Sequence, residues 1–132
     1  SDLIIENESM KYLNLLDNKV FISLTNTANG DVNSATRFYY SQKGLMITAK
    51  YEGGMIQIGS IVGKMLSDFE FEIYYQHLTV TNELRIGQCK TKIELLDNDV
   101  IKLIEDWQWL NGDLSTGHSE LIEVIPNSKN KI

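Results

Sequence analysis

The sequence predicts an all-β protein, a single antiparallel up-and-down β-barrel of about eight strands. Short runs of β-branched and aromatic residues alternate with turn signals about every 8 to 12 residues. The connections between the runs are too short for parallel crossovers, which need about a dozen residues. The one proline, Pro126, follows the last run, where its missing N–H disturbs no sheet.

Turn-forming pairs separate the predicted strands. Asn29-Gly30, Gly53-Gly54 and Asn111-Gly112 are examples that tolerate the tight backbone of hairpin loops. The strands are predicted at residues 19–26, 34–41, 45–52, 55–64, 69–79, 84–95, 100–110 and 116–125. The barrel domain is therefore expected at 19–125. A leader or short capping segment precedes it at 1–18, with a turn or helix around 12–16, and a tail follows at 126–132.

Composition limits the classes of partner. The 132 residues suit one domain, and 42% hydrophobic with 23% charged residues suit a packed core. A net charge of -6 argues against nucleic acid binding. The single cysteine, Cys89, permits no intramolecular disulfide, and no apolar run approaches the roughly 18 residues of a membrane span. We therefore expect a cytoplasmic protein with no membrane contact.

Alternation along a strand predicts which side chains face the barrel interior. Four of the runs alternate clearly enough to be assigned. The inward residues are predicted to be Leu45, Ile47, Ala49 and Tyr51 in the third run; Phe69, Phe71, Ile73, Tyr75 and His77 in the fifth; Arg85, Gly87, Cys89 and Thr91 in the sixth; and Ile101, Leu103, Glu105, Trp107 and Trp109 in the seventh.

One end of the barrel is predicted to hold a ligand pocket. Alternate turns of an up-and-down barrel lie at opposite ends, so the loops at 29–30, 53–54, 82–83 and 111–112 share one rim. Polar and aromatic side chains collect there, which suits a small apolar or aromatic molecule with one polar end. It would enter between the loops at 53–54 and 111–112. The predicted ligand-binding residues are Tyr51, Tyr75, His77, Arg85, Glu105, Trp107 and Trp109.

Several of these side chains also have a purely structural interpretation. Glu105 either pairs with Arg85 on the neighbouring strand or contacts the ligand, because a buried carboxylate needs a partner. The tryptophans either fill the core or line the pocket. His77 is interpreted either as a buried histidine whose hydrogen bonds are satisfied within the barrel or as a ligand-binding residue or general base.

No cofactor and no metal are expected. Cys89 is predicted to be a buried, unreactive thiol, and His118 a solvated side chain. The two histidines and one cysteine lack the short spacing of zinc ligands. No Gly-rich turn leads into a predicted helix, so no phosphate-binding loop is present.

Three functional hypotheses remain open. The first, which we favour, is a barrel that binds a small molecule. The second is an enzyme that uses His77 with Glu105, and the third is a ligand-free structural or regulatory homodimer.

The region from about Arg37 to Glu123 resembles a family of small bacterial lipocalin- or avidin-like (calycin-type) barrels. The resemblance rests on Tyr51-Glu52-Gly53-Gly54, the segment from Gly59 to Gly63-Lys64, Tyr75-Gln76-His77, Glu83-Leu84-Arg85 with Gly87 and Cys89, Glu105-Asp106-Trp107-Gln108-Trp109, and Gly112-Asp113 with Gly117. Members are often catalogued as N-acetylglutamate synthase, yet this sequence has no Gly-rich turn and helix of the kind that holds a coenzyme A pyrophosphate. The resemblance implies a barrel that binds small apolar or aromatic molecules.

Overall fold

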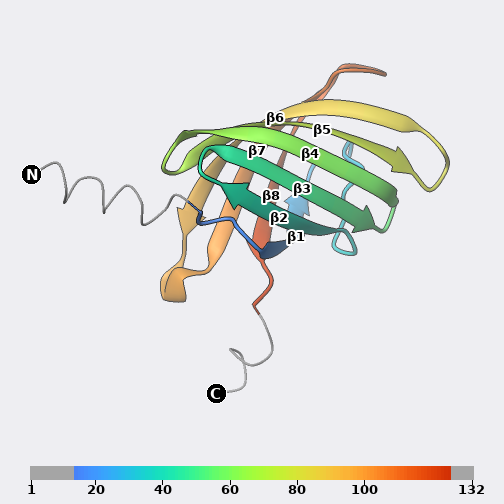
Figure 1. Ribbon diagram of the computed structural model, residues 1–132. Helices are drawn as coiled ribbons and strands as arrows, with labels where there is room; N and C mark the ends of the chain where they lie inside the picture. Colours follow the sequence, from blue (N-terminus) through green and yellow to red (C-terminus); the bar gives the residue numbers. More distant parts are fainter. Residues whose placement is uncertain (1–13, 126–132) are drawn as a thin grey trace, which may run out of the picture.

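The computed structural model describes residues 14–125, and within it eight strands form a closed antiparallel barrel in chain order (Figure 1). This confirms the predicted fold class. The strands are β1 (Lys19–Asn26), β2 (Arg37–Lys43), β3 (Met46–Gly53), β4 (Ile56–Ser67), β5 (Glu70–Thr79), β6 (Leu84–Leu95), β7 (Ile101–Trp109) and β8 (Thr116–Glu123), with a 3₁₀ turn η1 (Asp97–Asp99) before β7. No helix in this part of the chain is long and apolar enough to cross a membrane. The predicted tail at 126–132 and most of the predicted leader, residues 1–13, lie outside the described residues.

The barrel closes because β1 pairs with both β2 and β8. Phe21 lies opposite Phe38 on β2 and opposite Glu123 on β8. Short turns join most neighbouring strands, and their backbone enters the left-handed region at Gly44 (φ 60°) and Asn82 (φ 66°). Glycine and asparagine accept this region at little steric cost, which is why such pairs predict hairpins.

Large apolar side chains fill the half of the barrel that contains the β2–β3 and β4–β5 turns. The ring of Tyr40 packs edge-on against Phe21 and Phe71, with centroid distances of 5.3 and 6.2 Å. Leu103 and Leu121 are likewise fully buried there. We call this half the closed half.

Residues 14–18 form a turn that covers the closed half. Leu16 is fully buried in the core, and its N–H donates to Oε1 of Gln42 at 3.0 Å. The Asp17 carboxylate accepts from the N–H of Gln42 at 2.9 Å, and Asn14 Oδ1 accepts from the N–H of Gly44 at 2.9 Å. The described part of the predicted capping segment therefore caps the barrel.

The opposite half, which we call the mouth, carries the four loops predicted to share a rim (Figure 1). The longest is the loop at 27–36, which is longer than predicted because β2 begins at Arg37 and not at residue 34. Residues 33–36 instead form a turn: Asn33 Oδ1 accepts from the N–H of Ala35 at 2.8 Å, and the N–H of Thr36 donates to the Asn33 carbonyl at 3.0 Å. An Asx turn of this kind competes with strand pairing.

Two predicted inward residues are wrong. Leu45 is 60% exposed and Phe69 37% exposed, because each precedes the first residue of its strand and lies in a turn. Alternation of side chains holds only where the backbone is extended and paired. The other assigned positions of β3, β5, β6 and β7 are buried or half-buried, as predicted.

Glycines on three strands lie directly opposite aromatic residues of the mouth. Tyr51 pairs with Gly59, Tyr75 with Gly87, and Trp107 with Gly117. A Cβ added to these glycines would come within 2.4, 2.3 and 2.0 Å of the ring of its partner. Each ring therefore lies over the glycine and along the barrel wall, a position that any larger residue would block.

We predict that Gly117→Ala destabilises the protein by about 1–3 kcal/mol, because the new methyl group overlaps the Trp107 indole most closely and the Thr27 hydroxyl next. In a Trp107→Phe background the overlapping ring atoms are absent, so the same change should cost clearly less. Urea denaturation of the two single variants and the double variant measures this coupling. Additive effects would show that the glycine is not needed to place the ring.

Candidate functional site

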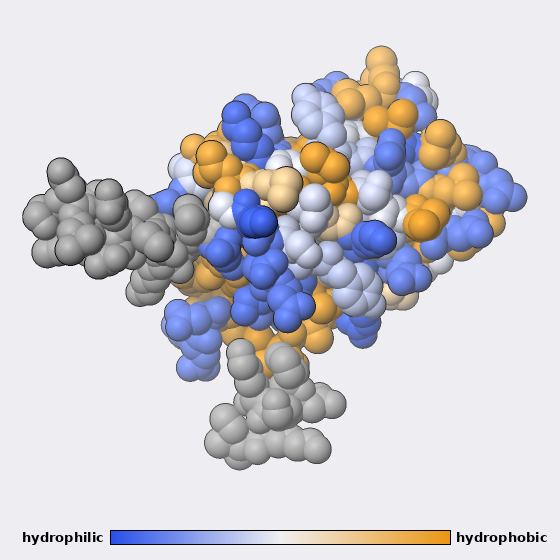
Figure 2. Space-filling view, viewed as in Figure 1, coloured by the Kyte–Doolittle hydropathy of each residue, from blue (hydrophilic) through white to orange (hydrophobic). Residues whose placement is uncertain are grey.

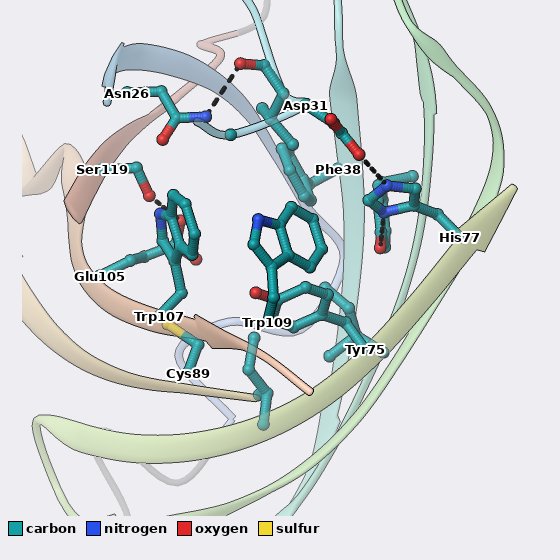
Figure 3. Close-up of a pocket in the computed structure, with 15 residues that line it drawn as sticks. Asn26, Asp31, Phe38, Tyr75, His77, Cys89, Glu105, Trp107, Trp109 and Ser119 are labelled. Carbon is teal, nitrogen blue, oxygen red and sulfur yellow. Dashed lines mark hydrogen bonds and ion pairs between the residues drawn. The ribbon is translucent and has the colours of Figure 1, made fainter. Parts of the chain in front are cut away.

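The mouth of the barrel contains a cavity of about 50 Å³. Aromatic rings form most of its wall, and polar side chains reach it from several elements (Figure 3). Its lining consists of Asn26, Gly30, Asp31, Val32, Phe38, Tyr51, Ile61, Ile73, Tyr75, His77, Cys89, Glu105, Trp107, Trp109 and Ser119. Six of the seven predicted ligand-binding residues therefore line one cavity, and the seventh, Arg85, lies beside it.

Trp109 is the centre of the aromatic wall. Its ring contacts Trp107, Tyr75 and His77, with centroid distances of 5.4, 5.9 and 5.6 Å. Its indole N–H donates to the Asn29 carbonyl at 3.2 Å, which satisfies the polar edge of a buried ring. This hydrogen bond also ties the loop at 27–36 to the end of β7.

His77 on β5 links the barrel wall to the same loop. Its Nδ1 lies 2.8 Å from the Tyr51 hydroxyl and its Nε2 lies 2.9 Å from the Asp31 carboxylate. Burial lowers the pKa of His77 below its usual value, although Asp31 acts in the opposite direction. A neutral imidazole fits both contacts when Nε2–H donates to Asp31 and Nδ1 accepts from Tyr51.

Arg85 also contacts the loop. Its guanidinium lies 3.6 Å from the Asp31 carboxylate and 4.0 Å from the centroid of the Trp109 ring. Asp31 therefore holds two mouth residues, His77 and Arg85, and the loop at 27–36 closes over the cavity. The positive charge of Arg85 is balanced by Asp31 and by the indole face.

Glu105 lies deeper in the barrel than either tryptophan. Its side chain is buried, and one carboxylate oxygen accepts from the Ser119 hydroxyl at 2.7 Å. Burial raises the pKa of Glu105 to about 7, against a smaller opposing effect of the Ser119 hydrogen bond. The group is therefore close to half protonated at neutral pH.

The predicted pair between Glu105 and Arg85 is not formed. The register places Glu105 opposite Thr91 on β6, six residues along that strand from Arg85. Six residues span about 20 Å, so the two side chains lie at different depths although both face inward. Figure 3 shows Glu105 and Ser119 on one side of the indoles and His77 with Asp31 on the other.

Several residues of the cavity could not be predicted from the sequence. Asp31 lies in a loop, where alternation gives no information, and the Asp-Val pair after Gly30 carries no distinctive motif. Asn26, Phe38 and Ser119 lie on β1, β2 and β8, whose runs were too ambiguous to assign. Phe38 stacks on Tyr51 with a centroid distance of 5.0 Å.

Two other titratable residues, Cys89 and His118, were considered from the sequence, and neither has surroundings that suit catalysis or metal binding. Cys89 is buried, and burial raises the pKa of its thiol. His118 is exposed on the outer face, where its Nδ1 lies 2.9 Å from the Asp106 carboxylate. Within residues 14–125, no three histidine, cysteine or acidic side chains are grouped so that they could hold a metal ion.

The fold and cavity define a class of protein, a small closed β-barrel with an internal pocket at one end. Residues 14–124 match a family described as avidin-like protein, so the chain belongs to the avidin-like family. No curated protein and no solved structure gives a significant match. Such a barrel suggests small-molecule binding in general and specifies no ligand.

Stability should depend on pH through Glu105. Its folded-state pKa of about 7 lies above the ordinary value of 4.5, so between these values the folded protein keeps a proton that the unfolded chain has lost. The contribution of Glu105 to the free energy of unfolding should therefore fall by about 3 kcal/mol as pH rises through this window, while the lowered pKa of His77 acts in the opposite direction below about 6.5. Tyr40 and Cys89 lie nearby inside the barrel, but burial raises their pKa values, so neither titrates in this window.

Glu105→Gln should remove this loss and be more stable than the wild type at about pH 8. Urea denaturation near pH 5 and near pH 8 measures the difference. The exposed Glu94→Gln is the control and should keep the wild-type slope. A Glu105→Gln variant with the same pH dependence as the wild type would contradict a buried, proton-holding carboxyl.

Proposed function

We propose that this protein binds a small molecule with an apolar or aromatic body and one polar end in the mouth of the barrel. The observation that carries the proposal is the unequal filling of the two halves. Large side chains fill the closed half, whereas the mouth keeps a cavity lined by rings and buried polar groups. Eight-stranded barrels either fill their interior or hold one small ligand, and ligand sites combine apolar walls with a few polar groups.

The loop at 27–36 determines how large a ligand can enter. A cavity of about 50 Å³ has room for a few water molecules or a small head group, far below the size of typical ligand pockets. A larger body therefore needs the loop to move away from the mouth. The contacts that would break are those of Asp31 with His77 and Arg85, and that of Asn29 with Trp109.

The geometry supports binding more than catalysis by His77 with Glu105. Both ring nitrogens of His77 have partners, Tyr51 and Asp31, and Glu105 lies on the other side of the indoles from His77 (Figure 3). A general base needs a free nitrogen or oxygen within about 3 Å of the proton that it removes. His77 is better suited to hold the loop over the cavity.

A homodimer is the alternative that one feature favours. Exposed apolar side chains gather on the outer wall of β4, β5 and β6, at Ile58, Val62, Tyr74, Leu84 and Ile86. The face seen in Figure 2 mixes polar and apolar residues. A dimer that binds no ligand has no need of an internal cavity, and the cavity in the mouth argues for a ligand whether or not the chain dimerises.

The binding proposal predicts different effects for two adjacent tyrosines. Tyr75 faces the cavity and Tyr74 faces solvent, where it is 56% exposed. A small-molecule library is first screened by intrinsic tryptophan fluorescence. Tyr75→Leu should then weaken binding of any hit by about tenfold or more, since a lost aromatic contact costs on the order of 1 kcal/mol beyond its buried area.

Tyr74→Leu should leave the dissociation constant unchanged. Circular dichroism checks that both variants keep the barrel. Hits that bind Tyr75→Leu as well as the wild type would place the ligand elsewhere, and a screen without hits would count against the binding function.

The contacts of Asp31 predict that the loop at 27–36 opens more often when this carboxylate is removed. Asp31→Ala removes the hydrogen-bond partner of His77 and the ion-pair partner of Arg85, and the lost hydrogen bond to the carboxylate alone costs about 1.5–3 kcal/mol. Amide hydrogen exchange in residues 27–36 should therefore accelerate about tenfold or more, while exchange in β4 to β6 stays the same. Asp68→Ala, in the turn at the other end, is the control. Unchanged exchange in the loop would show that Asp31 does not hold it closed.

A further inference from the structure

Glu105 is a buried carboxyl without a positive partner. Among residues 14–125, no lysine, arginine or histidine nitrogen lies within ion-pair distance of its oxygens, and its hydrogen-bond donor is the neutral Ser119 hydroxyl. Arg85, the nearest candidate from sequence, is held by Asp31 instead. Buried carboxyl groups are ordinarily paired or neutralised, so this one has an unused capacity to bind a cation.

The surroundings of Glu105 suit a cation. The cavity that it lines is walled by the rings of Trp107, Trp109, Tyr75 and Phe38. Ring faces attract cations, tryptophan most strongly, and the attraction is larger where water is excluded. An aromatic wall beside an unpaired carboxylate is an arrangement that recognises an organic ammonium group.

A second buried acceptor belongs to a residue that lines the same cavity. This residue is Asn26, whose amide nitrogen donates to the Val32 carbonyl at 3.0 Å, so the amide oxygen is the free end of the side chain. That oxygen is buried and has no partner among the described residues. An ammonium group has donors for both Glu105 and Asn26, whereas a carboxylate or ether ligand has none to offer.

We infer that the polar end of the ligand is a protonated amine, seated between the Glu105 carboxylate and the indoles. This inference rests on the proposed binding function and names the class of ligand for that site. The apolar or aromatic body of the amine would extend past Trp109 to the loop at 27–36. The ammonium group is also compact enough for a cavity of about 50 Å³.

The charge balance of the mouth agrees with this assignment. Asp31 and Glu105 contribute two carboxyl groups against the single guanidinium of Arg85. The neutral His77 uses its Nε2–H on Asp31, so it offers no donor to an anion. An anionic ligand would therefore meet excess negative charge in a low-dielectric space, which is unfavourable.

The test compares three probes that share one body and differ only in the polar end: 2-phenylethylamine, 2-phenylethanol and phenylacetate. Their dissociation constants for the full chain are measured near pH 7 by isothermal titration calorimetry. The amine should bind at least about tenfold more tightly than the alcohol, as expected when a charged hydrogen bond replaces a neutral one. Phenylacetate should bind most weakly of the three.

Glu105→Gln keeps the shape of the side chain and an acceptor for Ser119 but removes the negative charge. In this variant the preference for the amine over the alcohol should disappear, while binding of the alcohol changes little. Asp106→Asn, the next residue on β7 with its side chain outside the barrel, is the matched control and should keep the preference.

The outcomes separate this inference from the binding function. Binding of 2-phenylethanol or phenylacetate as tight as that of the amine would overturn the ammonium assignment and leave small-molecule binding intact. The ammonium assignment would also be overturned if the preference for the amine survived Glu105→Gln. The same holds if every library compound whose binding depends on Tyr75 were neutral or anionic. Failure of the three probes and of every library compound would overturn both.

Discussion

Closure of the barrel is the constraint on which the site depends. Eight strands enclose an interior just wide enough for side chains, so each inward residue either fills it or leaves space. In the closed half the rings of Phe21, Tyr40 and Phe71 meet at the centre. In the mouth, rings lie over glycines of the neighbouring strand, as Trp107 does over Gly117. Placing aromatic residues along the wall leaves the centre open, so the cavity follows from the strand register.

The loop at 27–36 covers part of this open end and lines the cavity with Gly30, Asp31 and Val32. Its Asp31 carboxylate binds His77 and Arg85, which lie opposite each other on β5 and β6. The lowered pKa of His77 keeps the ring neutral, so Tyr51, His77 and Asp31 form a chain of hydrogen bonds with a defined direction. The Asp31 carboxylate therefore both holds the loop over the cavity and orients the imidazole of His77.

Local patterns predicted the barrel and most of its inner face, because hairpin turns and alternation depend on neighbouring residues alone. The register between strands was harder to predict than the inner face. Glu105 and Arg85 both face inward, yet only the pairing of Glu105 with Thr91 shows that they lie at different depths in the barrel. Leu45 was misassigned because alternation ends where a turn begins. Asp31 could not be found at all, since a loop residue acquires its role only when the closed barrel brings His77 and Arg85 beside it.

Glu105 has a role that barrel stability does not explain. A glutamine at this position could accept the same hydrogen bond from Ser119 without a charge to desolvate. The carboxyl instead has its pKa raised to about 7, so ionising it at neutral pH and above costs folding free energy. Sites of function commonly carry such a cost to stability. The location of Glu105 at the base of an aromatic cavity, with Asn26 as a second acceptor, supports the inferred recognition of a positively charged group.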